Sequence, residues 1–148
     1  GNTWQLVRMM HENKLMKVIR EKVVNGTPFV GWSAGSNVAC PTLRTTNDMP
    51  IVDPLGFDTM GLIPFQINPH YLDANPEGHG GETRQQRIEE FLEVNPELYV
   101  VGLREGTMLR VEDQKMSLIG NRTARIFRKG ADFFELSSDD DFSFLLMA

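Results

Sequence analysis

The sequence has a single cysteine, few basic residues and no long hydrophobic run. Because only Cys40 carries a thiol, no disulfide can form within the chain, which excludes a small domain held together by disulfides. No stretch approaches the roughly 18 consecutive apolar residues of a membrane-spanning helix. The 15 Lys and Arg against 20 Asp and Glu give a net charge of −5. That balance argues against nucleic-acid binding, which needs clustered cations. The lone cysteine and the acidic balance favour a cytoplasmic location.

Apolar residues are nevertheless plentiful. They make up 41% of the 148 residues, enough for a buried core in one domain. Three histidines and one cysteine stand at unrelated positions, so we expect no metal site and no cofactor. The sequence begins with Gly1 rather than methionine, which bears on the organisation of the chain considered below.

The spacing of apolar residues predicts alternating helices and strands. We expect helices over 4–10, 15–23, 34–40 and 84–94, the last with Thr83 as its N-cap. The apolar runs 28–32 and 98–103 indicate buried strands, and 62–67 a further strand. Short segments at 107–111, 115–119 and 123–127 indicate C-terminal hairpins. This order predicts an α/β fold with a mostly parallel sheet and an antiparallel addition.

The most informative segment is Gly31-Trp32-Ser33-Ala34-Gly35. It fits the G-x-S-x-G pattern and lies between a predicted strand and a predicted helix, the context in which such a serine is a nucleophile. Its two glycines are expected to relieve crowding around a strained serine. The backbone N–H of Ala34 then faces the oxyanion that forms when Ser33 attacks a carbonyl.

A nucleophilic serine needs a base, and the chain offers only His11, His70 and His79. His70 follows the strand 62–67, at the carboxyl end where α/β sheets bind ligands, and is the preferred base. We expect His11 to be a surface residue in a helix–helix turn. His79 lies in a glycine-rich loop, which argues against catalysis.

The acid that orients the histidine is less well defined. Glu105 follows the strand 98–103, whereas Asp48 lies in the loop after the nucleophile helix, and position alone ranks Glu105 only slightly ahead. With Glu105 as the acid, the chain order Ser33, His70, Glu105 differs from that of α/β-hydrolases, whose acid precedes the histidine. The order therefore argues against a common esterase or lipase.

Several segments together resemble the peptidase E family, the aspartyl dipeptidases among the serine peptidases. The resemblance extends to about Phe127, and its matching segments are Gly1-Asn2-Thr3, Gly31-Trp32-Ser33-Ala34-Gly35, residues 44–54, Gln66-Ile67-Asn68-Pro69-His70 and Gly81-Glu82-Thr83-Arg84. It implies a three-layer fold similar to class I glutamine amidotransferases, of flavodoxin-like type. It also implies a Ser-His-Glu triad of Ser33, His70 and Glu105, acting on dipeptides with an N-terminal aspartate.

The same resemblance suggests the binding residues. Arg84 is the candidate reader of the substrate's aspartate side chain, because arginine binds a carboxylate bidentately; Arg44 and Arg104 are weaker candidates. Asp48 is a candidate partner of the substrate's amine, but Glu77 and Glu82 are not excluded. The family's glycine-rich turn, which here ends in Gly1-Asn2-Thr3, implies a second oxyanion N–H at Gly1.

Family members also carry β–α units before the position of Gly1. We therefore expect residues 1–148 to be the C-terminal part, about two-thirds, of a single catalytic domain. Alone this part is expected to be unstable and inactive, unless its missing N-terminal segment or a homo-oligomer partner pairs with it. Two alternatives to the aspartyl dipeptidase remain: a cyanophycinase-like exopeptidase with another acidic substrate, and a non-catalytic binding module of the same fold.

Overall fold

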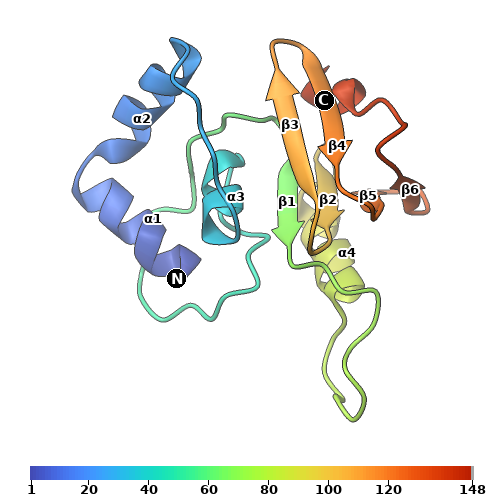
Figure 1. Cartoon of the computed structure of the whole chain (residues 1–148). Coiled ribbons are helices and arrows are strands. Elements are labelled where there is room, and N and C mark those ends of the chain that lie inside the picture. The colour runs from blue at the N-terminus through green and yellow to red at the C-terminus, as the bar shows by residue number, and fades with distance from the viewer. Residues whose placement is uncertain (148) are drawn as a thin grey trace. The chain divides into compact units, whose positions relative to one another are not determined.

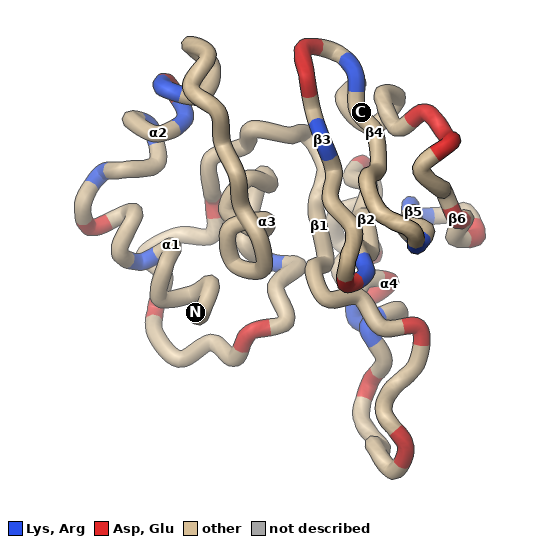
Figure 2. The backbone as a smooth tube through the Cα atoms, in the orientation of Figure 1, with Lys and Arg blue, Asp and Glu red and all other residues tan. Residues whose placement is uncertain are grey.

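The computed structural model describes residues 1–147 and shows a chain of mixed α/β type (Figure 1). The chain divides into two compact units, Gly1–Pro69 (the first unit) and His70–Ala148 (the second unit). Basic and acidic residues are interspersed along both units (Figure 2). Over the described residues no helix has both the length and the apolar character needed to cross a membrane.

The first unit contains the helices α1 (Thr3–Glu12), α2 (Leu15–Val24) and α3 (Ala34–Ala39) and the strand β1 (Gln66–Pro69). These bounds confirm the three predicted helices. Asn2 caps α1, because its side-chain oxygen accepts from the Gln5 N–H, and Asn25 ends α2. The core of the unit is formed by Val7, Met10, Val38, Leu43 and Met60.

The second unit contains one long helix, α4 (Arg84–Val94), and five strands. The strands are β2 (Tyr99–Leu103), β3 (Met108–Glu112), β4 (Lys115–Ile119), β5 (Ala124–Arg128) and β6 (Phe134–Leu136), and a short 3₁₀ helix follows at Ser143–Met147. β5 lies between β2 and β6, antiparallel to both, and β3 pairs with β4 in a separate antiparallel hairpin. The predicted C-terminal hairpins are confirmed in this form. α4 packs against the sheet through a cluster of Tyr71, Ile88, Leu92, Val100 and Phe127.

Two predicted strands differ from the structure. Residues 28–32 form no strand, and the side chains of Val30 and Trp32 are 77% and 78% exposed. The apolar run identified a segment suited to a sheet, but within the first unit no neighbouring strand pairs with it. The strand predicted at 62–67 is β1, shifted toward 69. The shift arises because Met60 and Leu62 donate backbone hydrogen bonds back to Val38 and Ala39, and residues 62–65 bend before the strand begins.

Candidate active site

Ser33 has a backbone conformation that few residues other than glycine adopt. Its φ of 53° and ψ of −117° lie outside the ordinary helical and extended regions, directly before the first residue of α3. Such a conformation costs free energy and persists only where the surrounding structure imposes it. Here the imposed turn consists of hydrogen bonds from Gly35 N–H to Trp32 O (2.8 Å) and from Ser36 N–H to Ser33 O (3.0 Å). A strained serine on a turn into a helix is typical of a nucleophile.

Gly31 is the glycine that this turn requires. A Cβ added to Gly31 would stand 2.6 Å from the carbonyl oxygen of Gly35, a backbone atom that cannot rotate away. A Cβ at Gly35 would meet nothing within 4 Å. The expectation that both glycines relieve crowding is therefore correct for Gly31 and wrong for Gly35. Gly35 contributes only its carbonyl oxygen to the close approach, and a side chain at position 35 would point into open space.

This asymmetry predicts opposite effects of two alanine substitutions. Gly31→Ala is expected to lower the free energy of unfolding by about 2 kcal/mol, because the new methyl group forces the two backbone segments apart. Gly35→Ala, in an open helical position, is expected to leave it unchanged or to raise it by about 0.5 kcal/mol. Urea unfolding of the full protein measures both. Equal destabilisation by the two substitutions would contradict the assigned contact.

Ala34 is the first residue of α3, so its N–H belongs to the helix turn that has no intrahelical acceptor. Within the first unit no other group accepts from it. The helix is held from its other side by Asn37, whose buried amide donates to Ile67 O of β1 at 2.9 Å. Ala34 thus presents a fixed donor beside the serine. Gly1 is exposed and precedes the Asn2 cap of α1; its role as a second oxyanion donor stays a prediction.

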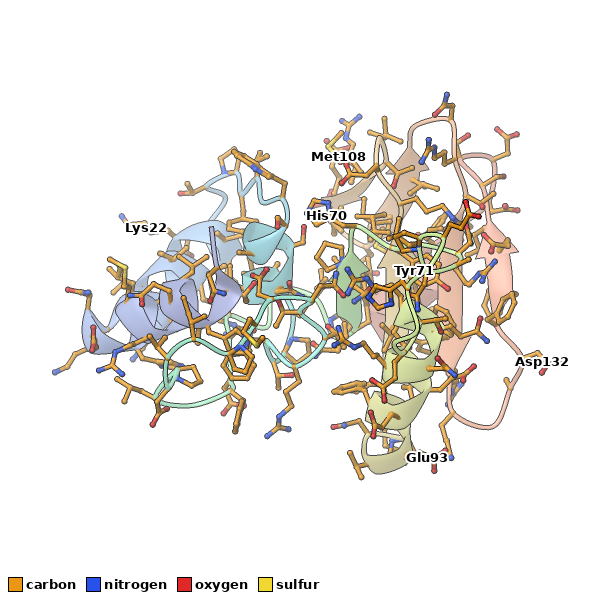
Figure 3. All side chains as sticks on the ribbon, turned by 90° about the horizontal axis from the view of Figure 1, so that it is seen from below. Lys22, His70, Tyr71, Glu93, Met108 and Asp132 are labelled. Atoms are coloured by element: carbon orange, nitrogen blue, oxygen red, sulfur yellow. The ribbon has the colours of Figure 1, made fainter. Side chains whose placement is uncertain are left out.

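His70 and Glu105 are brought together within the second unit. His70 follows β1, has a φ of 54°, and its Nδ1 is hydrogen-bonded to Oε1 of Glu105 (His70 is labelled in Figure 3). Because the partner is a carboxylate, Nδ1 carries the proton and Nε2 is left as the basic nitrogen. The turn after β2 that holds Glu105 is closed by Thr107 N–H donating to Arg104 O, with Gly106 at a φ of 78°. This is the arrangement of a base and its orienting acid.

Asp48 has a structural role that the sequence did not reveal. Its Oδ2 accepts from the N–H and the hydroxyl of Thr3, at 2.6 and 2.7 Å, and its carbonyl accepts from the Trp4 indole. A carboxylate at the first turn of α1 is favoured by the helix dipole. Asp48 therefore fastens its loop to the start of α1. Its predicted contact with a substrate amine remains a prediction.

The other two histidines have local partners. His11 Nε2 lies 3.1 Å from Asp58 O, and His79 Nδ1 accepts from the N–H of Gly81 at 3.1 Å. His11 is half-buried at the end of α1, and His79 is exposed in its loop. Neither is paired with a carboxylate among the described residues of its own unit.

Arg84 is a partly buried cation at the N-terminus of a helix. It is the first residue of α4, between the two members of the capping box, Thr83 and Gln86, where the helix dipole disfavours positive charge. Burial and then the nearby charge of Arg87 lower the pKa of Arg84. No carboxylate of the described part of the second unit lies within 4.0 Å of its guanidinium. An unpaired, desolvated guanidinium is suited to bind a carboxylate ligand.

The weaker arginine candidates are already engaged. Arg44 stacks over the ring of Phe57, 4.6 Å from its centroid. Arg104 is ion-paired on two sides, with Asp73 and Glu135, and its side chain is only 10% exposed. Arg104 therefore offers no unoccupied guanidinium. Arg44 is exposed and already stacked on an aromatic ring, whereas Arg84 is partly buried, which favours Arg84 among the three.

The sequence matches a known protein family over most of its length. The family model described as peptidase family S51 matches residues 1–119, which include Ser33, His70 and Glu105. The chain belongs to peptidase family S51. It is 56% identical over 146 residues to a peptidase E of Nostoc sp., covering 99% of this chain and 60% of that protein. It is 51% identical to a peptidase E of Salmonella arizonae and 50% to one of Escherichia coli O1:K1 / APEC, in both cases over 96% of this chain and 62% of the relative. The chain thus spans about 60% of the length of these relatives.

Proposed function

We propose that the protein containing this chain is a serine dipeptidase that hydrolyses dipeptides with an N-terminal aspartate. The observation that carries the proposal is the backbone of Ser33, a strained serine on a G-x-S-x-G turn at the start of α3. The hydrogen-bonded His70 and Glu105 supply the chemistry that such a serine requires. Membership of family S51 and the similarity to peptidase E proteins support the same activity.

The proposed reaction proceeds through an acyl-enzyme. Ser33 Oγ attacks the peptide carbonyl while its proton passes to Nε2 of His70. Glu105 stabilises the imidazolium, and the Ala34 N–H, with Gly1 as a second donor, stabilises the oxyanion. His70 then gives the proton to the leaving amine. Water, deprotonated by the same histidine, releases the aspartate and restores Ser33.

Arg84 is proposed to bind the side-chain carboxylate of the substrate's aspartate. The argument is its desolvated guanidinium, which has no ion-pair partner in the described part of the second unit. Asp48, with Glu77 and Glu82 as alternatives, is proposed to bind the substrate's amine. Small acidic dipeptides are accordingly the proposed ligands, rather than nucleic acid or a membrane.

The finer organisation of the protein is part of the proposal. The resemblance to peptidase E favours a three-layer, mostly parallel sheet of class I glutamine amidotransferase type, with residues 1–148 as one part of a single domain. The exposed apolar segment 28–32 fits a strand that pairs with a further segment of that domain or with a second copy. A cytoplasmic location is proposed because the chain has a single cysteine, Cys40, which cannot form a disulfide within the chain.

The substrate class is tested with three dipeptides and one pair of arginine variants. Asp-Leu is expected to be hydrolysed, whereas Glu-Leu and β-linked aspartyl dipeptides are expected to be poor substrates. Arg84→Met should lower kcat/KM for Asp-Leu by about 100-fold, because the substrate carboxylate loses a charged partner. Arg87→Met, on the exposed face of the same helix, is the matched control, with an expected effect below about threefold.

The outcomes separate the proposal from its rivals. Preferential cleavage of β-linked aspartyl peptides or of Glu-Leu would favour a cyanophycinase-like exopeptidase. The absence of turnover with every acidic dipeptide, together with no labelling of Ser33 by a serine-reactive phosphonate, would favour a binding module.

A further inference from the structure

The second unit contains a partly buried ion cluster that lies close along the chain to the His70–Glu105 pair, and no step of the proposed reaction uses it. Its centre is Arg104, whose side chain is 10% exposed. Nε and Nη2 of Arg104 donate to the two oxygens of Asp73 at 3.2 and 2.5 Å, and Nη1 and Nη2 donate to those of Glu135 at 2.8 and 2.9 Å. Nη1 also donates to the carbonyl oxygen of Thr123 at 2.7 Å. One guanidinium thus holds two carboxylates bidentately.

A second arginine closes the cluster. Arg125 of β5 donates to Glu135 at 2.6 Å and to the Tyr71 hydroxyl at 3.2 Å, and it lies 3.1 Å from Asp73. The guanidinium groups of Arg104 and Arg125 both lie over the ring of Tyr71, 5.5 Å from its centroid (Tyr71 is labelled in Figure 3). The cluster therefore ties β5 and β6 to the segment that begins at His70.

The charges of the cluster are held strongly. Hydrogen bonds from Arg104 lower the pKa of Asp73. Burial opposes ionisation of Glu135, but hydrogen bonds from Arg104, Thr123 and Arg125 outweigh it and lower its pKa to about 2. Both carboxylates are therefore ionised at neutral pH, and the two bidentate pairs keep a fixed geometry.

The cluster lies next to both members of the catalytic pair along the chain. Arg104 directly precedes Glu105, and Asp73 follows His70 by three residues, so their ion pair joins the two segments that carry the acid and the base. The same segments are joined by the Tyr71 N–H donating to Leu103 O at 3.0 Å. The ring of Tyr71 also packs on Gly102, where an added Cβ would stand 2.7 Å from it.

The catalytic pair itself is poorly placed to fix its own geometry. The side chains of His70 and Glu105 are 48% and 66% exposed. An exposed ion pair contributes little and competes with water, so a constraint from elsewhere is needed to keep Nδ1 aligned with the carboxylate. Arg104 supplies this constraint. Its side chain is only 10% exposed, although those of its partners Asp73 and Glu135 are 57% and 33% exposed, and it holds each carboxylate by two hydrogen bonds.

We propose that Arg104 is a positioning residue for catalysis, which aligns His70 with Glu105 by clamping Asp73 and Glu135. This role rests on the proposed serine peptidase function. It assigns to Arg104 no contact with substrate. The proposed role implies that a positive charge at position 104 is not sufficient to align His70 with Glu105. The alignment requires the planar guanidinium, whose several N–H donors bind two carboxylates at once.

The test is Arg104→Lys in the full protein, which keeps the positive charge but cannot clamp both carboxylates. With Asp-Leu, kcat is expected to fall about 10-fold with KM changed by less than about twofold, because alignment rather than binding is lost. In proton NMR, the downfield N–H signal of the hydrogen-bonded His70 ring should be lost.

One variant is a control for general destabilisation, and a second replaces Arg104→Lys if that protein does not stay folded. Arg110→Met breaks the exposed Arg110–Glu112 pair, whose side chains are 57% and 66% exposed, and should leave kcat, KM and the NMR signal unchanged. If Arg104→Lys unfolds at the assay temperature, Asp73→Asn releases one of the two clamped carboxylates and should lower kcat about threefold with the same loss of signal.

An unchanged kcat or an unchanged His70 signal in Arg104→Lys would overturn the positioning role, even if stability falls. A wild-type protein that shows the downfield signal but does not hydrolyse Asp-Leu would refute the proposed function and leave the alignment by Arg104 standing. The two failures are thus distinguishable.

Discussion

Replacement of Ser33 by alanine is expected to lower kcat for Asp-Leu by about 10⁶-fold, to near the rate of background hydrolysis. The reason is that no acyl-enzyme can form without the hydroxyl, whereas binding through Arg84 is retained. KM for any residual turnover should therefore change little. Steady-state kinetics on the full protein, with mass spectrometry after a serine-reactive phosphonate, measure both the loss and the missing label.

The matched control is Ser117→Ala, at an exposed position of β4, which should retain full activity. Retention of Asp-Leu hydrolysis by Ser33→Ala would refute the nucleophile assignment outright. A third variant gives an independent signature. Ser33→Gly should be as inactive as Ser33→Ala but more stable than wild type by about 1 kcal/mol, because glycine adopts a φ of 53° without strain. Stability and activity would then change in opposite directions at a single residue, as expected where strain serves function.

The elements that the sequence predicted well are those with local signals. The helix α4 was located by Thr83, whose capping box is present in the structure, and by the Asn95 that ends it. The hairpin β3–β4 was located by its alternating residues and by Asp113, which adopts a φ of 54° in the turn. Both signals lie within a few residues of the element that they define, and they need no knowledge of the rest of the fold.

The elements that were missed depend on distant partners. Whether residues 28–32 form a strand is decided by a neighbouring backbone, which the local apolar pattern does not specify. The start of β1 was displaced because Met60 and Leu62 donate to Val38 and Ala39. These are long-range contacts, and no propensity of the segment itself indicates them.

The same division applies to the candidate site. Ser33 was identified by its own pentapeptide, and His70 by its place after a predicted strand. The choice between Glu105 and Asp48 depended on the resemblance to a family, because both follow plausible elements. The hydrogen bonds that separate them, Glu105 to His70 and Asp48 to Thr3, span 35 and 45 residues. The Arg104 cluster was missed for this reason as well, since Asp73 and Glu135 each lie 31 residues from it.

Replacement of His70 by alanine is expected to cost about as much as the loss of Ser33, about 10⁶-fold in kcat, because the serine then has no base. Asp-Leu turnover by the full protein measures the loss. His79→Ala is the matched control, an exposed histidine that pairs only with the nearby Gly81 N–H, and it should stay within about twofold of wild type. A large loss in His79→Ala with little loss in His70→Ala would show that the wrong histidine had been chosen.

The double variant Ser33→Ala/His70→Ala decides whether the two residues act as one unit. If His70 serves only to activate Ser33, removing the base from an enzyme that already lacks the nucleophile has no further effect, and the double variant is as slow as either single one. Independent roles would instead multiply the two losses. Glu105→Gln should be less severe, at about 10⁴-fold, since His70 and Ser33 remain and only the orientation and stabilisation of the imidazolium are lost. A loss for Glu105→Gln below about threefold would mean that the hydrogen bond between His70 and Glu105 does not serve the reaction, and that another carboxylate orients the base.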